Sequence, residues 1–161
     1  MTGRYSIRQA VLLGGLVAGT IDIGAASLIS WRSPIFICQG VASGLLGRAS
    51  FAGGMQTTFA GLLLQWVMSL FIAAIYVIAS AWLPALKRRW IAGGLAYGVG
   101  IFFVMNYVVV PLSAVHRVPH FTVQTFVENM LAMLLFGLIV AFFARRTGTA
   151  AEPRKAAASA V

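Results

Sequence analysis

The chain has few acidic residues, few charged residues of either sign and a single cysteine. Only three of its 161 residues are Asp or Glu, and 9% are charged, whereas soluble domains carry about 25% charged residues. Because 60% of the residues are hydrophobic, a soluble fold could not hide the apolar surface they carry. The lone Cys38 excludes an internal disulfide and any metal site built from several cysteines. The composition therefore indicates a membrane protein.

What the sequence does contain is long apolar runs. A helix of about 20 residues, rising about 1.5 Å per residue, crosses a hydrocarbon core about 30 Å thick. Four runs reach this length, at residues 10–30, 55–83, 90–112 and 121–144. We predict an all-α membrane protein with four transmembrane helices, forming a single domain over residues 1–146. The Ala-rich tail, 147–161, has too few large apolar groups to fold, so we expect it to be disordered and cytoplasmic.

The segment between the first two runs, residues 34–52, is rich in glycine and too short to cross a membrane alone. Its polar residues Gln39, Ser43 and Ser50 recur at helical spacing, and its apolar residues fall largely on the other side. We predict an amphipathic helix that begins after Pro34 and lies in the outer interface. A re-entrant segment packed inside the bundle is the alternative, since non-helical backbone at membrane depth must be satisfied by protein or water.

The basic residues are distributed unequally between the segments that connect the apolar runs. Short loops rich in Lys and Arg stay in the cytoplasm. If the N-terminus is cytoplasmic, nine Lys and Arg residues lie on the inner side and three on the outer side, which predicts that both termini are cytoplasmic. Basic residues at the helix ends can contact anionic lipid headgroups, which accounts for the net charge of +9. We therefore expect the lipid bilayer as a partner and no nucleic acid. With a cytoplasmic N-terminus, the inner residues are Arg4, Arg8, Lys87, Arg88, Arg89, Arg145, Arg146, Arg154 and Lys155, and the outer ones are Arg32, Arg48 and Arg117.

Glycines occur in pairs with three residues between them inside two of the runs. Gly15 and Gly19 lie in the first run, and Gly94 and Gly98 lie in the third. This spacing lets membrane helices approach each other closely, so we expect these four residues at helix contacts. The surrounding sequences are similar, which hints at two parallel helical hairpins, although small-residue spacing is common in membrane helices without any duplication.

Two acidic residues fall inside the apolar runs, Asp22 in the first and Glu128 in the fourth. A charged side chain at the centre of a membrane helix costs about 2.5–3.5 kcal/mol on insertion scales, so both should face the bundle and not the lipid. Helical spacing places Asp22 on the same side as Gly15, and places Glu128 beside Gln124 and Asn129.

Helical rise puts these two carboxyl groups at nearly the same depth, in the outer half of the membrane. Gln65 of the second run and Asn106 of the third fall within several ångströms of that depth. We therefore predict a layer of polar side chains to which every helix contributes. It can serve to hold the helices in register, or it can form a proton or cation site because two nearby carboxyl groups can share a proton.

The loop between the third and fourth runs contains His116, Arg117 and His120. Two histidines four residues apart can bind a metal on a helix, but Pro119 favours a turn or an extended path. We predict a solvated, pH-responsive loop with no metal site. Pro111 is expected to bend or end the third helix.

The sequence contains no recognisable catalytic arrangement. It has no G-x-S-x-G, no phosphate-binding glycine loop and no H-E-x-x-H. Both histidines fall in one outer loop, away from any nucleophile inside the runs. We predict that the protein is not an enzyme and has no catalytic residues and no cofactor.

Three stretches are similar to a known group of proteins. They are GLVAGTxD at residues 15–22, ASGLLG at 42–47 and MNxxVxPLS at 105–113. The chain resembles, over about residues 10–146, a group of small bacterial inner-membrane proteins and more distantly the YagU-like family of unknown function. The resemblance implies four helices in a bacterial inner membrane. Asp22 and Asn106 match its pattern, but relatives carry histidines where this chain has Gln65 and Asn129, which puts a histidine-based metal or proton site in doubt.

These observations together predict a non-enzymatic structural or accessory membrane protein. Proton or cation handling by the layer around Asp22 and Glu128 is the alternative. A third hypothesis is an assembly role, in which the glycine faces contact a second copy or another membrane subunit.

Overall fold

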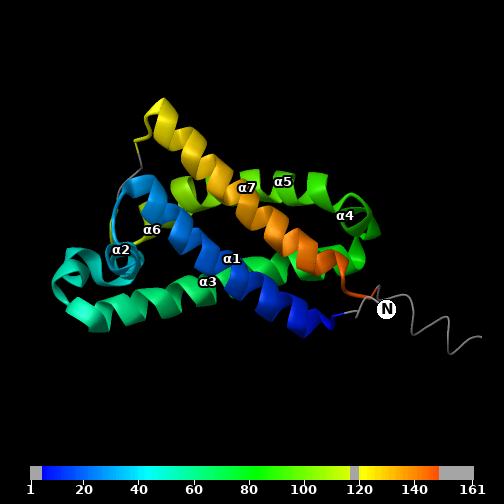
Figure 1. Cartoon of the computed structure of the whole chain (residues 1–161), viewed down its shortest axis with the longest axis horizontal. Coiled ribbons are helices and arrows are strands. Elements are labelled where there is room, and N and C mark those ends of the chain that lie inside the picture. Colours follow the sequence, from blue (N-terminus) through cyan, green and yellow to red (C-terminus); the bar gives the residue numbers. More distant parts are fainter. Residues whose placement is uncertain (1–4, 117–119, 149–161) are drawn as a thin grey trace, which may run out of the picture.

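The computed structural model describes residues 5–116 and 120–148 (Figure 1). Within these residues the chain is helical and forms no sheet, which confirms the predicted all-α class. Most of the tail predicted to be disordered lies outside the described residues. The elements are α1 (Ile7–Ser30), α2 (Pro34–Leu46), the 3-10 helix η1 (Gly47–Ala52), α3 (Gly54–Trp82), α4 (Pro84–Arg88), α5 (Trp90–Val104), the π-helix η2 (Met105–Val109), α6 (Val110–Leu112) and α7 (Val123–Arg145).

Five helical segments within these ranges are long and apolar enough to cross a membrane, by length and composition. Four of them correspond to the apolar runs in the sequence. The fifth, Pro34–Ala52, joins α2 and η1 and is the segment for which the sequence predicted an interfacial or re-entrant position. The chain thus has the helices of a multi-pass membrane protein, and the described residues contain five candidate spans, one more than predicted.

The long helices run roughly side by side along the longest axis of the molecule (Figure 1). Helix α1 packs against both α3 and α7, and α5 packs against α7. The short helix α2 packs mainly on α3. With η1, it lies at the end of the bundle where α1 ends and α3 begins (Figure 1). This arrangement leaves α3 and α5 on the two flanks of α1 and α7.

The contact between α1 and α3 depends on two of the predicted glycines. A Cβ atom on Gly15 would lie 2.9 Å from Cα of Leu70, and one on Gly19 would lie 2.8 Å from Cβ of Ser69. Cβ atoms almost never approach other heavy atoms this closely. The backbones of α1 and α3 can therefore be this close only because these positions lack side chains.

Glycines also allow α5 to pack closely against α7. A Cβ atom on Gly98 would lie 2.5 Å from the carbonyl oxygen of Met133, and one on Gly94 would lie 2.9 Å from Cβ of Ala141. Gly137 of α7 occupies the facing position, where a Cβ atom would lie 2.8 Å from the nitrogen of Gly98. Each glycine pair thus contacts the next long helix along the chain.

Local sequence signals define the ends of the helices. Ser6 and Gln9 form a capping box at the start of α1, and Thr122 and Thr125 form one at the start of α7. The ends of the described chain meet, because the amide of Tyr5 donates to the carbonyl of Arg146 at 3.0 Å. In the same region, Lys87 donates to the carbonyl of Gly148 at 2.8 Å.

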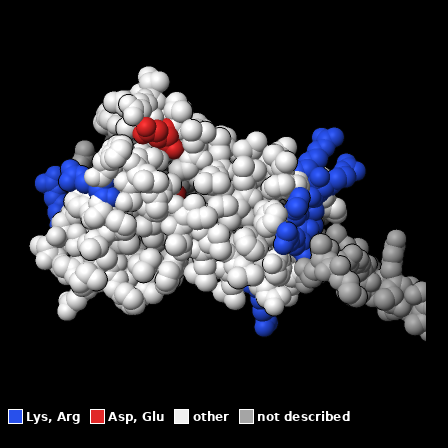
Figure 2. Space-filling view, in the orientation of Figure 1, with Lys and Arg blue, Asp and Glu red and all other residues white. Residues whose placement is uncertain are grey.

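Charged and apolar side chains are separated on the surface. Lys and Arg gather toward the two ends of the molecule and leave the middle of the visible face free of them (Figure 2). Large apolar side chains are exposed between these ends, including Phe71 at 68% and Leu131 at 59%. Such a surface is unfavourable in water and suits contact with lipid.

Candidate functional site

A pocket of about 960 Å³ lies at the α2 end of the bundle. It is bounded by α2, by the first half of α3 and by the segment from η2 to the turn after α6. We call it the α2-end pocket. Its rim is open, since Leu45 and Leu112 in its lining are 71% and 79% exposed. Apolar groups dominate the lining, which includes Phe36, Val41, Leu45, Leu64, Gln65, Met68, Met105, Val109 and Leu112.

The helix α2 forms one wall of the pocket and is fixed on two sides. Toward α3, the carbonyl of Cys38 packs directly on Gly61, where a Cβ atom would collide with it. The side chain of Gln39 also donates to the carbonyl of Gly54 at 3.1 Å. On the opposite side, the amide of Ala114 donates to the carbonyl of Gly44 at 2.9 Å. The wall therefore bridges α3 and the turn that follows α6.

The opposite wall contains a local change in helix geometry. After α5, the helix widens into the π-turn η2, in which the amide of Val110 donates to the carbonyl of Met105, before α6 ends at Leu112. Asn106 donates from its side chain to the carbonyl of Phe102 at 2.8 Å. The sequence predicted a bend or an end at Pro111, and the helix does end shortly after it, although the departure from α geometry precedes the proline. Such π-turns are often found at functional sites.

Asp22 and Gln65, which the sequence placed at similar depths, meet beside the pocket. The side chain of Gln65 donates from Nε2 to Oδ2 of Asp22 at 2.9 Å, and Gln65 lines the pocket. One residue further along α3, Trp66 donates from Nε1 to Oγ1 of Thr20 at 3.2 Å. Because the amide nitrogen of Gln65 donates to Asp22, the amide oxygen of Gln65 is left as an acceptor.

The other polar side chains of the predicted layer bond within their own helices. Glu128 accepts from Gln124 at 2.9 Å, and Asn129 donates to the carbonyl of Thr125 at 2.7 Å. No hydrogen bond joins Asp22 to Glu128, both of which are described. Asn side chains readily bond a carbonyl four residues earlier, which satisfies them without a partner on another helix. The predicted layer is therefore not one hydrogen-bonded network.

The predicted loop residues stay separate from these polar groups. His116 and His120 are exposed, and His116 adopts a positive φ of 48°. Arg117 lies outside the described residues. In the part of the chain that the structure describes, no group of three or more His, Cys, Asp or Glu side chains could hold a metal ion.

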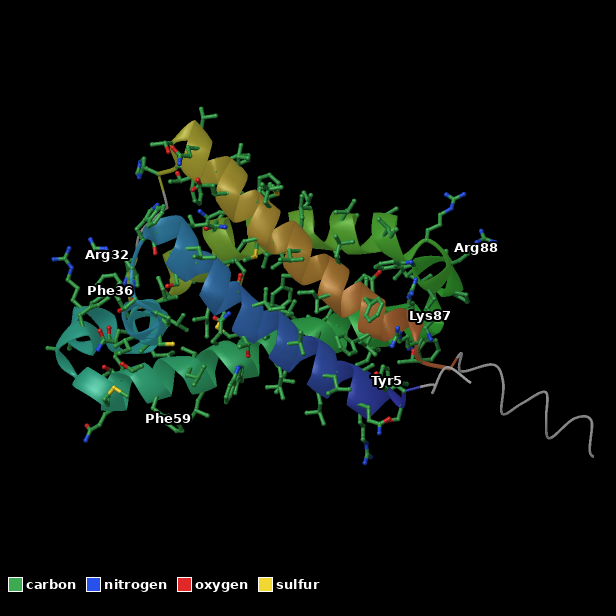
Figure 3. The ribbon with its side chains drawn as sticks, in the orientation of Figure 1. Tyr5, Arg32, Phe36, Phe59, Lys87 and Arg88 are labelled. Carbon is green, nitrogen blue, oxygen red and sulfur yellow. The ribbon has the colours of Figure 1, made fainter. Side chains whose placement is uncertain are left out.

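Arg32 lies at the edge of the pocket, and sequence reasoning treated it only as an outer charge. Its guanidinium carbon lies 5.0 Å from the centroid of the ring of Phe36, a residue that lines the pocket (Figure 3). That ring also contacts Phe51, with 5.0 Å between centroids. The backbone amide of Arg32 donates to the carbonyl of Ser27 at 3.2 Å. The sequence signal that could have predicted this contact is the spacing of four residues between Arg32 and Phe36, across the start of α2.

Comparisons with known proteins give no relative from which a role could be transferred. No protein-family model, curated protein or solved structure matches the chain. The resemblance to the YagU-like family therefore remains a prediction, and the function is inferred from the pocket and its neighbouring residues.

Proposed function

We propose that the protein is a four-span membrane protein of the bacterial inner membrane, in which α2 and η1 enter the outer half without crossing. Support comes from the course of the chain, because residues 34–52 start and finish at the same end of the bundle (Figure 1). A segment that starts and finishes on one side of a membrane does not span it. The bacterial source rests on the family resemblance.

In this topology both termini are cytoplasmic. The amide of Tyr5 and the carbonyl of Arg146 are hydrogen-bonded, so the described ends of the chain lie on one side, which requires an even number of spans. The basic residues of α4 and of the end of α7 gather at that same end (Figures 1 and 2). Positive charge at this end favours the cytoplasm, and Arg32 at the other end is then external.

The role we propose is non-enzymatic: the protein holds the acyl chain of a membrane lipid in the α2-end pocket. The observation that carries this proposal is the pocket itself. Its 960 Å³ lies at the upper end of the roughly 300–1,000 Å³ typical of ligand sites, and its lining is mostly apolar. The helices around it expose apolar side chains to the surface, and acyl chains are the abundant apolar molecules there.

The test fills the pocket with a larger side chain. Met68→Trp places an indole in the lining, whereas Val67→Trp introduces the same side chain one residue away, at a position that is 61% exposed and does not line the pocket. We expect Met68→Trp to lower the amount of lipid that copurifies in mild detergent, measured by native mass spectrometry, by about tenfold, the equivalent of about 1.4 kcal/mol. The Val67→Trp control should retain lipid. Equal retention by both variants would refute the proposal.

The second candidate is proton or cation handling at Asp22. It is favoured by one observation, namely that this half-buried carboxylate is bonded to an amide and makes no ion pair among the described residues. An acid without a basic partner inside a membrane is often functional. Since Glu128 is bonded elsewhere, this candidate now depends on Asp22 and Gln65, and its test is proton flux with an Asp22→Asn variant.

A further inference from the structure

We propose that the lipid held in the α2-end pocket is an anionic phospholipid and that Arg32 binds its phosphate. This inference rests on the proposed function and adds the chemical class of the ligand. The choice of an anionic lipid follows from how a pocket inside a membrane can distinguish one lipid from another. An acyl chain is already in an apolar environment in the bilayer, so moving it into an apolar pocket brings little hydrophobic gain. Selectivity must come from the headgroup.

The position of Arg32 suits a headgroup contact. The residue lies between α1 and α2, next to Trp31, which is 92% exposed. Tryptophan near a helix end favours the headgroup region of the bilayer. Phe36 connects the two parts of the site, because this residue lines the pocket and its ring lies under the guanidinium of Arg32. A lipid with its tail among the apolar lining residues would thus have its phosphate near Arg32.

The side chain of Arg32 is also preorganised to bind an anion. Stacking on the Phe36 ring restricts the guanidinium, so less freedom is lost when it binds. Its planar shape with several donors matches the oxygens of a phosphate, which a lysine would contact only as a point charge. No ion pair engages Arg32 among the described residues, and α2 and η1 contain no acidic residue. Its donors are therefore open to an external anion.

The chain offers a matched control in Arg48. This arginine belongs to η1 at the same end of the molecule and is exposed, as Arg32 is, but no aromatic ring of the described residues is stacked with it. Arg48→Gln therefore removes the same charge from the same end without removing the stacked guanidinium. Arg32→Lys is a second test variant, since it keeps the charge and loses the planar, stacked group.

The experiment measures lipid preference with the full chain. The protein is reconstituted in nanodiscs that contain phosphatidylglycerol and phosphatidylcholine with identical acyl chains, and the retained lipids are counted by native mass spectrometry. We expect wild type to prefer phosphatidylglycerol by on the order of tenfold, as for one charge-assisted contact. Arg32→Gln and Arg32→Lys should lose most of this preference while total retained lipid stays similar. Arg48→Gln should keep it.

Each other outcome has a definite meaning. Equal loss in Arg32→Gln and Arg48→Gln would show general attraction by charge and overturn the assignment to Arg32. A wild type without preference would overturn the inference but leave the proposed function standing, provided that Met68→Trp still lowers total lipid. Millimolar inorganic phosphate should not displace the lipid, and displacement would identify free phosphate as the ligand. Unchanged melting temperature of the Arg32 variants shows that the fold is retained.

Discussion

Replacing Gly98 by alanine should loosen the contact between α5 and α7. The new Cβ atom would lie 2.5 Å from the carbonyl oxygen of Met133 and 2.8 Å from Cα of Leu134. Both are backbone atoms, so the collision can be relieved only by moving a helix. Gly100 lies two residues further along the same helix, and a Cβ atom added there would meet no atom within 4 Å. Gly100→Ala is therefore the matched control.

The magnitude follows from two opposing terms. Alanine stabilises a helix by about 1 kcal/mol relative to glycine, and this gain applies to both variants. Overpacking costs about 1–3 kcal/mol and applies only to Gly98→Ala. The difference between the two variants is therefore about 1–3 kcal/mol, or roughly 2–12 °C in melting temperature for a chain of this size.

Thermal unfolding in mild detergent, followed by circular dichroism, measures this difference directly. Gly98→Ala should melt below Gly100→Ala, and the two should differ little in helical content before melting. If the variants melt at the same temperature, the close approach of α5 to α7 at Gly98 is absent, and the inferred role of glycine in this contact is wrong.

Two further predictions concern α2 and Asp22. Gly61→Ala would push α2 away from α3, so the buried Cys38, at 5% exposure, should react with a maleimide at least several times faster, whereas Gly40→Ala, with open space at its side-chain position, should leave the rate unchanged. An unchanged rate in Gly61→Ala would contradict the packing of α2 on α3. In proteoliposomes tested across a range of pH, Asp22→Asn should leave proton flux at the wild-type level if the protein only holds lipid. Flux in wild type that is lost in Asp22→Asn would instead establish the second candidate.

Much of the fold follows from patterns that repeat within one helix. The apolar runs predicted the long helices because length and hydropathy are local properties. The glycine pairs predicted the close contacts of α1 and α5 because helical spacing fixes which residues share a face. The same reasoning treated residues 34–52 as too short to cross and left an interfacial and a re-entrant position open, although their length and composition suffice for a span. Both ends of this segment lie at one end of the bundle because of the course of the neighbouring helices, which no local pattern shows.

The candidate site was only partly predictable for a related reason. Helical rise gives the depth of a side chain in a bundle but not its lateral distance from another helix. Asp22 and Gln65 lie at a similar depth and are also laterally close, and their side chains are hydrogen-bonded. Glu128 was predicted at a similar depth and yet bonds Gln124 on its own helix. The α2-end pocket depends on how α2 folds across α3 and on the π-turn, neither of which has a local sequence pattern.

The π-turn also affects the direction of the residues that complete the second wall of the pocket. A π-turn accommodates one residue more than a regular α-turn, and one residue corresponds to a rotation of about 100° around the helix axis. Leu112 and Ser113 follow this turn and line the pocket. On an uninterrupted helix Leu112, the last helical residue of α6, would have a different angular phase and would face another direction. The extra residue in the helical winding thus contributes to the direction in which the last helical part of this wall faces.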